Sequence, residues 1–333
     1  MDNLELDQAE RNTISQLLDE FEEEFYGLDQ ENALHHATVY AHELPKRLRL
    51  ALNAFRLEQL SGVLTISGHP IDHDRLGPTP AHWRDRPDPS PARREELLLL
   101  LYGSLLGDPF IWATQQDGRL VHDVIPIKGH EHEQLGSSSE ALLTWHTEDA
   151  FHPMRGDFLL FACLRNPYSA ATTVGYIDDL RLPDATKATL LEKRYVISPD
   201  ESHLAHNNSA PDEGVFAGIS QMQEAPDLVS VLFGDPAKPY IRADPYFMSV
   251  GAGDDEARLA LDQLVEAMDD QMFDMKLESG EYCFLDNHRV VHGRKPFNAR
   301  HDGTDRWLKR INVTSDLRKS RAARVSASAR SIR

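Results

Sequence analysis

The chain has 333 residues, which is long enough for one large domain or two small ones. Its 54 acidic and 35 basic residues give a net charge of -19, and such a surface repels nucleic acid and anionic membranes, so neither is expected as a partner. Two cysteines are too few for a disulfide framework or a cysteine zinc site, and we expect buried free thiols. Without a secretion signal or an apolar run of membrane-spanning length, the chain is expected to be cytoplasmic.

The first third of the chain is predicted to be mainly helical. Residues 1–60 show helical periodicity, and the apolar residues from Ile14 to Phe25 share one helical face. The predicted elements that follow are a strand over 62–66, a loop rich in proline over 68–92 and a helix over 93–106. Residues 1–106 are therefore expected to form a helical N-terminal part.

Beyond residue 107 the pattern changes to short strands separated by turn residues. The predicted strands cover 120–127, 157–163, 194–197, 228–233, 240–243, 282–285 and 307–313. One amphipathic helix interrupts them at 254–272. This order predicts one α+β domain whose core, over 107–317, is an antiparallel barrel or sandwich. The tail over 318–333 carries six basic residues and no acidic one, and is expected to be frayed and solvated.

A His-x-Glu pair is the first candidate for a metal site. His146 is the only one of the 16 histidines with an acidic residue two places on, Glu148, and residues i and i+2 of a strand share a face. His292, placed after a strand, supplies a third ligand. Two histidines and one carboxylate form the facial triad of iron(II) oxygenases, which leaves positions open for a chelating co-substrate and dioxygen. Catalytic zinc is the competing metal, but its helical His-Glu-x-x-His signature is absent.

Two arginines near the last predicted strand are candidates for anion binding. A 2-oxoacid that chelates the metal needs a cation at its far carboxylate, and the planar guanidinium suits a carboxylate best. Arg306 comes after His292 in the sequence and is expected on this last strand. Arg310, four residues on, is expected on the same face of the strand. A surface salt bridge is the alternative for either arginine. The segment 129–133, in which His and Glu alternate, is either a second metal site or a polar loop beside the first one.

These motifs, in this order, resemble the clavaminate synthase-like 2-oxoglutarate oxygenases, especially the arginine β-hydroxylase of viomycin biosynthesis and related amino-acid hydroxylases of peptide-antibiotic pathways. The similar stretches are 112–118, 146–151, 164–167, 200–204, 291–294 and 302–310. The resemblance implies a double-stranded β-helix core of the jelly-roll or cupin type, with helices around it and a lid inserted around 198–225.

The resemblance also implies which side chains hold the cofactors. Iron(II) would be bound by His146, Glu148 and His292, which are the catalytic residues. The co-substrate 2-oxoglutarate would be bound by Arg306 with help from the Thr172 hydroxyl, and dioxygen is the second co-substrate.

The implied substrate-binding residues are Gln115, Ser137, Glu148, Asp200, Asp244, Tyr246 and Arg310. In the resembling family the positions of Gln115 and Glu148 bind the substrate ammonium, and that of Arg310 binds its carboxylate. The positions of Asp200, on the lid, and Asp244 receive a guanidinium. A buried guanidinium needs such carboxylate partners.

We therefore expect a hydroxylase of a free basic L-amino acid, with L-arginine at the β-carbon as the leading candidate. The chain departs from the arginine pattern at Tyr246, where that pattern has a second acidic residue, so a cyclic arginine or lysine stays open. Attack at another carbon and desaturation also fit. A metal-binding β-barrel without redox chemistry is the alternative class, but it would have no use for Arg306 and Thr172. The sequence does not indicate the oligomeric state.

Overall fold

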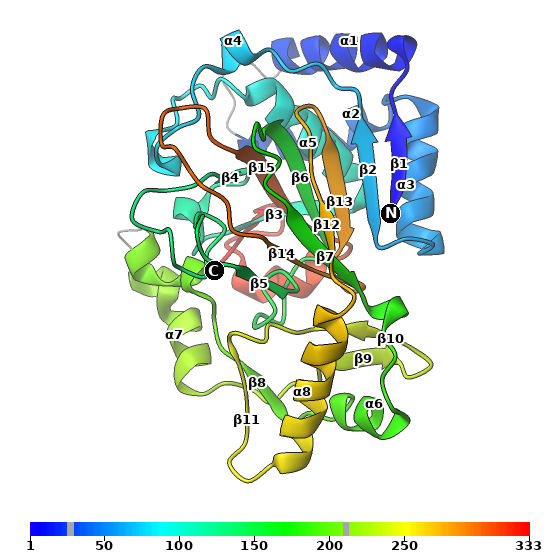
Figure 1. Cartoon of the computed structure of the whole chain (residues 1–333). Helices are drawn as coiled ribbons and strands as arrows, with labels where there is room; N and C mark the ends of the chain where they lie inside the picture. The colour runs from blue at the N-terminus through cyan, green and yellow to red at the C-terminus, as the bar shows by residue number, and fades with distance from the viewer. Residues whose placement is uncertain (25–29, 209–212) are drawn as a thin grey trace.

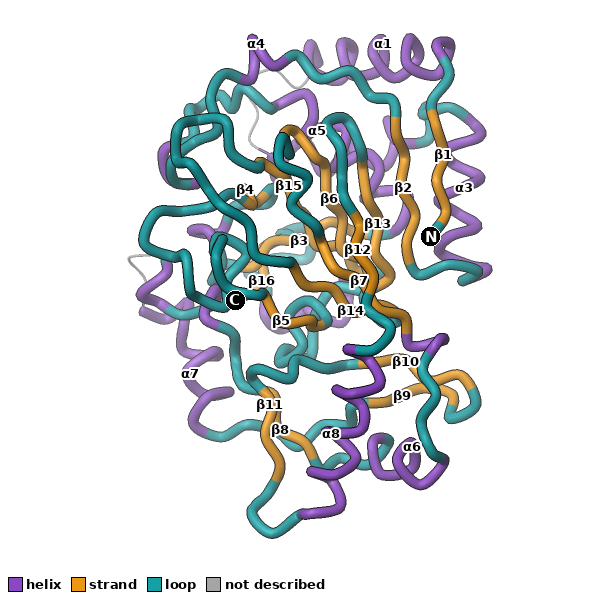
Figure 2. Tube along the Cα trace, in the orientation of Figure 1, coloured by secondary structure: helices purple, strands orange, loops and turns teal. Residues whose placement is uncertain are grey.

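The computed structural model describes residues 1–24, 30–208 and 213–333, so Phe25 and part of the expected lid lie outside the described residues. Figures 1 and 2 show a layer of N-terminal helices, a large sheet and a smaller sheet in front of it. The described helices are α1 (Gln8–Glu24), α2 (Gln30–Ala41), α3 (Lys46–Glu58), α4 (His73–Leu76), α5 (Arg93–Leu106), α6 (Asp184–Leu190), α7 (Ala217–Glu224) and α8 (Asp255–Asp269).

The large sheet runs in the order β1 (Asp2–Glu5), β2 (Val63–Ser67), β13 (Tyr282–Asp286), β6 (Phe158–Arg165), β15 (Trp307–Thr314), β3 (Asp108–Trp112) and β16 (Ser331–Ile332), and β4 (His122–Val124) also pairs with β15. Its neighbours are antiparallel except at the two edges, where β1 runs parallel to β2 and β16 runs parallel to β3.

The smaller sheet is antiparallel and has the order β12 (Phe273–Met275), β7 (Thr172–Tyr176), β14 (Val290–Arg294) and β5 (Leu143–His146). Two further pairs lie beyond it, β9 (Leu232–Asp235) with β10 (Lys238–Ile241) and β8 (Tyr195–Ile197) with β11 (Met248–Val250).

Strand β6 joins the layers because it is buried on both faces. Phe158 and Leu160 pack with α5 in the core beneath the helices, whereas Leu159 and Phe161 point into the core between the two sheets. Successive side chains of a strand alternate between its faces, so a strand covered on both sides is apolar along its whole length. The continuous apolar run at this position follows from that double burial.

The predicted α+β class is confirmed, and the predicted helices over 93–106 and 254–272 correspond to α5 and α8. The described strands form separate sheets and do not close into one barrel. Strand β1 was missed because four residues beside a long helix carry too little periodicity to stand out. That the layers form a single domain stays a prediction. Among the described residues no helix is long and apolar enough to cross a bilayer.

The prediction of a solvated C-terminal tail is wrong. Strand β16 pairs with β3, and Ile332 is only 1% exposed. The Arg324 guanidinium is buried and donates to the carbonyl oxygens of Ala327 and Ala329, at 2.7 and 2.6 Å. Basic side chains therefore bind backbone carbonyls within the tail, and its composition alone did not reveal this. The prediction of buried free thiols is confirmed for both cysteines.

A buried ion-pair cluster ties α5 to the large sheet. The Lys309 ammonium, 0% exposed, pairs with Glu96 at 2.8 Å and also with Asp123. The Trp307 indole N–H donates to Asp123 at 2.7 Å, and Arg86 lies 3.2 Å from Glu96. Buried charges of this kind are tolerated because each one meets an opposite charge.

Removing the cation of this cluster is predicted to destabilise the fold. Lys309→Met should lower the free energy of unfolding by about 3–5 kcal/mol, because it deprives two buried carboxylates of their ammonium. Lys295→Met is the matched control, since its 55% exposed ammonium pairs with Asp274 at the surface, and should cost less than about 1 kcal/mol. Chemical denaturation measures both differences. Equal stability of Lys309→Met and the wild type would contradict this role.

A second prediction concerns acid stability. His69 donates from Nδ1 to the Gly280 carbonyl at 3.0 Å and accepts at Nε2 from the Tyr102 hydroxyl at 2.8 Å, and burial lowers its pKa to about 4. The His69 imidazole binds a proton near pH 6.5 in the unfolded chain but only near pH 4 in the folded chain. The free energy of unfolding therefore falls as the pH drops through this window. Between about pH 7.5 and about pH 5, His69→Gln should lose about 2 kcal/mol less free energy of unfolding than the wild type. Urea denaturation at both pH values measures this difference. An identical pH dependence in the variant would count against a neutral His69.

Candidate active site

The pairing of β5 with β14 brings the two candidate histidines together. His146 and His292 are cross-strand partners, and their ring centroids lie 4.6 Å apart. Directly opposed residues of an antiparallel pair point to the same face. A side chain at Gly293 would meet the Leu143 carbonyl oxygen at 2.5 Å, so glycine permits this close approach of the strands. His292 follows the predicted strand over 282–285, which is β13, and itself lies within a further strand, β14.

Glu148 completes the group from a turn. Strand β5 ends at His146, so Glu148 lies beyond it, and the prediction that both residues share a strand face is wrong. The two side chains nevertheless lie together. Asn287 fixes the turn by accepting from the Glu148 backbone N–H at 2.7 Å and donating to its carbonyl at 3.0 Å. Glu148 Oε2 lies 3.8 Å from His146 Nε2 and 3.4 Å from His292 Nε2.

These three side chains fit a metal ion. One ligand atom from each lies within 4.8 Å of the others, and all three come from one side of a cavity. His146 donates from Nδ1 to the Thr144 carbonyl at 2.8 Å, which leaves Nε2 free as a ligand. Burial alone would raise the pKa of Glu148, but Arg310 and the two histidines hold it well below its usual value, so the carboxylate is ionised. Two imidazoles and one carboxylate suit iron(II) or catalytic zinc.

A second group of three ligand atoms, from Asp149, Asp200 and His203, also lies within 4.8 Å. Hydrogen bonds account for its geometry. The Asp149 carboxylate accepts from the Trp112 indole N–H at 2.5 Å and from His203 Nε2 at 3.0 Å. Asp200 accepts from the Ser202 backbone N–H at 2.9 Å. We therefore treat this group as a hydrogen-bonded network and not as a second metal site.

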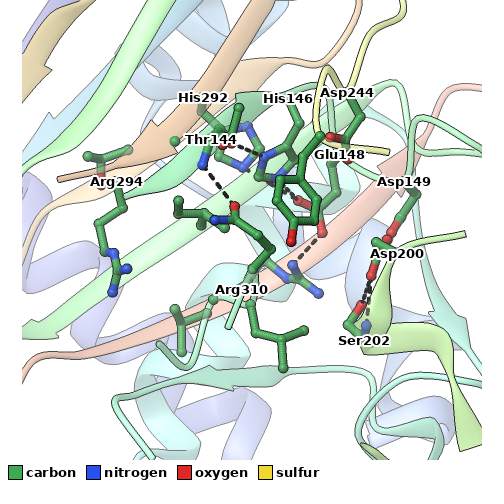
Figure 3. A pocket seen from close by; sticks show the side chains of 18 of the residues that line it. Thr144, His146, Glu148, Asp149, Asp200, Ser202, Asp244, His292, Arg294 and Arg310 are labelled. Carbon is green, nitrogen blue, oxygen red and sulfur yellow. Dashed lines mark hydrogen bonds and ion pairs between the residues drawn. The ribbon is translucent and has the colours of Figure 1, made fainter. Parts of the chain in front are cut away.

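A cavity that opens to solvent lies in front of the three ligands, and its empty space, with the open solvent at its mouth included, is about 840 Å³ (Figure 3). The predicted site residues that line it are His146, Glu148, Thr172, Asp200, Asp244, Tyr246, His292, Arg306 and Arg310. Gln115 lies behind this surface, where its amide oxygen accepts from Arg310 at 3.1 Å. Ser137 is also outside the lining and bonds to His130 Nδ1 at 2.8 Å, next to the lining residue Gly136.

Arg306 is a buried cation that faces the cavity without a carboxylate partner among the described residues. It donates from Nη2 to the Thr172 hydroxyl at 3.3 Å, and its buried Nε has no partner in this part of the chain. Burial lowers its pKa to about 10, so the guanidinium stays charged at neutral pH. Arg294, which also lines the cavity, donates to the Ser138 hydroxyl and the Ala141 carbonyl, both at 2.9 Å. Because Arg294 uses both of its Nη atoms on neighbouring residues whereas Arg306 makes a single hydrogen bond, Arg306 is the more available of the two to an anion.

Arg310 contacts the metal ligands directly, because its guanidinium pairs with Glu148 Oε1 (Figure 3). The guanidinium also approaches His122 Nδ1 at 2.8 Å, in addition to its contact with Gln115. The two arginines thus have different partners in the lining of the cavity, Thr172 for Arg306 and Glu148 for Arg310. Arg306 itself immediately precedes β15, and Arg310 lies within it.

The remaining wall is acidic. Asp200 and Asp244 line it, and neither forms an ion pair with a cation among the described residues. Burial raises the pKa of Asp244 to about 6. Tyr246, 58% exposed, lies at the mouth with its ring 4.9 Å from that of Phe247. A cationic group between these carboxylates would be stabilised.

The segment 129–133 is a polar loop, as the simpler interpretation of its sequence held. Glu131 accepts from the Gly129 backbone N–H, and no metal-binding group among the described residues includes the loop. Residues that sequence reasoning did not single out are Arg294, Ser202 and Asp149 in the lining and His203 behind it. All four lie in the stretches 146–151, 200–204 and 291–294, which carry the family resemblance. That location was the signal in the sequence that could have identified them.

Comparisons with known proteins agree with this geometry. The family model of the taurine catabolism dioxygenase TauD, TfdA family matches residues 88–312. The chain is 45% identical to enduracididine beta-hydroxylase of Streptomyces hygroscopicus over 328 residues, 96% of both chains. It is 46% identical to L-ornithine/L-arginine 3-hydroxylase of Catenulispora acidiphila over 291 residues, 84% of both.

A crystal structure of the non-heme iron oxygenase OrfP in complex with Fe, succinate and (3S)-hydroxy-L-Arg has the same fold. The TM-score is 0.96 at 46% identity, and all of both chains is covered. The predicted resemblance to 2-oxoglutarate oxygenases is confirmed by these matches. The chain belongs to the TauD/TfdA family of dioxygenases.

Proposed function

We propose that the chain is an iron(II)- and 2-oxoglutarate-dependent hydroxylase of free L-arginine at the β-carbon. The observation that carries this proposal is the buried Arg306, which faces the cavity of a two-histidine, one-carboxylate group without a carboxylate partner among the described residues. The relatives support the carbon, because their names specify β- or 3-hydroxylation, which is the same position. OrfP supports the cofactors, since it was crystallised with Fe and succinate.

The metal would be held by His146, Glu148 and His292, whose ligand atoms leave the cavity side free. Iron(II), when bound with 2-oxoglutarate and dioxygen, supplies the oxidation of a C–H bond, with succinate and carbon dioxide as the other products. The protein holds each reactant in place and keeps water away from the reacting atoms.

Arg306 and Thr172 would bind the carboxylate of 2-oxoglutarate that lies far from the metal. A buried guanidinium without a counter-ion is costly, and a bound dianion supplies that counter-ion. The planar guanidinium donates two parallel hydrogen bonds to a carboxylate, which also sets the orientation of the co-substrate.

The amino-acid end of the substrate would lie beside the metal ligands. Arg310 would bind the α-carboxylate, and Gln115 and Glu148 would bind the ammonium, because Arg310 already contacts both of these side chains. The cationic end would extend toward Asp200 and Asp244 on the acidic wall. With the amino-acid end anchored at a metal ligand, the first side-chain carbons are those nearest the metal, which supports attack at the β-carbon.

Several finer points belong to the same proposal. A cyclic arginine is the second candidate substrate, because one relative is an enduracididine hydroxylase and Tyr246 lies at the cavity mouth. Lysine, attack at another carbon and desaturation are further alternatives, which product masses distinguish. We also propose that Ser137 supports the substrate-binding wall and that the two sheets are halves of one double-stranded β-helix. A single domain acting in the cytoplasm completes the proposal.

The metal assignment predicts a selective loss of iron binding. His292→Ala should weaken anaerobic iron(II) binding by about 100-fold or more, because it removes one of three ligands. His301→Ala, at an exposed histidine, is the matched control and should bind iron like the wild type. Isothermal titration of both variants gives the affinities. Wild-type affinity in His292→Ala would disprove the ligand set.

The co-substrate assignment predicts a specific kinetic effect. Arg306→Ala should raise KM for 2-oxoglutarate by about 100-fold or more, with Arg306→Lys between it and the wild type, since an ammonium supplies charge without the planar fork. Arg300→Ala, which removes an exposed guanidinium, is the control. Mass spectrometry of free amino acids follows the gain of one oxygen atom. An unchanged KM in Arg306→Ala would place the co-substrate elsewhere, and no turnover of any basic amino acid would contradict the substrate class.

A further inference from the structure

One wall of the cavity is made by the segment 198–208, which contributes Asp200 and Ser202 to the lining. The segment holds only two short 3-10 turns, Glu201–His203 and Ala205–Asn207, and no strand or α-helix. Apart from one backbone hydrogen bond at its start, its position on the core therefore depends on side-chain contacts among the described residues. At its start the Ser198 backbone N–H donates to the Phe247 carbonyl at 3.0 Å, and within it the Asn208 amide donates to the Ser202 carbonyl at 2.9 Å.

His203 is the side chain of this segment that reaches deepest into the core, and it is 0% exposed. Its Nε2 donates to Asp149 Oδ1 at 3.0 Å, and its Nδ1 lies 2.7 Å from the Thr114 hydroxyl. The ring also packs against Trp112 and Phe151, with centroids 5.5 and 4.9 Å apart. Both ring nitrogens are thus used on residues outside the segment, and one of these residues, Asp149, itself lines the cavity.

Asp149 links this histidine to the metal group. It directly follows Glu148 and has a φ of 52°, in the left-handed region that aspartate tolerates better than most residues. Its other carboxylate oxygen accepts from the Trp112 indole N–H at 2.5 Å. One carboxylate therefore holds both the turn that presents Glu148 and the segment that presents Asp200.

A second contact runs from the same segment to the amino-acid end of the cavity. The Gln115 amide N–H donates to the Ser202 hydroxyl at 2.7 Å, and the Gln115 amide oxygen accepts from Arg310 at 3.1 Å. Displacement of His203 would move Ser202, its neighbour, and thereby both ends of the substrate-binding wall.

We propose that His203 is a positioning residue for the amino-acid substrate: its hydrogen bond to Asp149 holds Asp200 and Ser202 in a fixed position relative to Glu148. The proposal rests on the proposed function for the identity of the substrate. It predicts that loss of this bond weakens binding of the basic amino acid and leaves binding of 2-oxoglutarate unchanged, because Arg306 and Thr172 make no hydrogen bond to this network among the described residues.

Three variants of the full chain test the role of His203. His203→Leu removes both hydrogen bonds, His203→Gln keeps an N–H donor near the position of Nε2, and His203→Asn keeps a polar group near that of Nδ1. The matched control is His206→Leu, at an exposed histidine of the same segment. Thermal denaturation of each variant reports whether it is folded.

The kinetic readout compares two Michaelis constants. With turnover of L-arginine by the wild type established, KM for L-arginine should rise about tenfold or more in His203→Leu, while KM for 2-oxoglutarate stays within about twofold. His203→Gln should restore most of the loss and His203→Asn should not. An unchanged KM for L-arginine in His203→Leu, or an equal rise of both constants, would overturn the proposal. If His203→Leu does not fold, equal KM values in the Gln and Asn variants would overturn it.

Hydrogen–deuterium exchange gives a readout that needs no substrate. His203→Leu, or His203→Asn if the leucine variant does not fold, should speed exchange in peptides covering 201–208 and leave those covering β6 unchanged. Unchanged exchange over 201–208 would overturn the proposal, as would equal acceleration in β6. If the wild type turns over no basic amino acid, the proposed function fails, and the exchange result still decides whether His203 positions this wall.

Discussion

The antiparallel pairing of β5 with β14 is the constraint on which the site depends. It makes His146 and His292 cross-strand partners, so two imidazoles point to one place without any contribution from a loop. The third group, Glu148, needs the Asn287 side chain, which bonds to both the N–H and the carbonyl of Glu148. A rigid pair on strands and a tethered carboxylate in a turn together form a preorganised metal group.

The distribution of charge around this group explains how one cavity can hold both a dianion and a basic amino acid. Arg306 and Arg310 both line the cavity, where Arg306 contacts Thr172 and Arg310 contacts Glu148. The two acidic residues Asp200 and Asp244 also line it. An acidic wall repels a dianion such as 2-oxoglutarate and attracts a basic side chain. The buried arginine and the acidic wall therefore sort the co-substrate and the substrate into separate places.

Much of this arrangement could be predicted from the sequence. The spacing of His146 and Glu148, the apolar run of β6 and the helix α5 are local patterns, and each of them was found where the structure has it. The family resemblance assigned Arg306 and Thr172 to the same ligand, and in the structure these two side chains share a hydrogen bond.

The remainder depends on contacts between distant segments. Strand β14 mixes valine, histidine, glycine and arginine. Its sequence therefore lacks the alternation of apolar and polar residues from which the strand and its pairing with β5 could have been predicted. The docking of β16 on β3 was hidden for a similar reason, because two residues carry no periodicity. The link from His203 to Asp149 joins two buried polar residues that are 54 positions apart, and no local rule connects them.

Isotope labelling tests the central claim most directly. The enzyme would be loaded with iron(II) under anaerobic conditions, mixed with L-arginine and 2-oxoglutarate, and exposed to ¹⁸O₂. If the chain is a 2-oxoglutarate-dependent hydroxylase of arginine, mass spectrometry will find a labelled oxygen in the arginine product and one in succinate. Succinate without any labelled amino acid across arginine, cyclic arginine and lysine would contradict the substrate assignment, and the absence of labelled succinate would contradict the reaction itself.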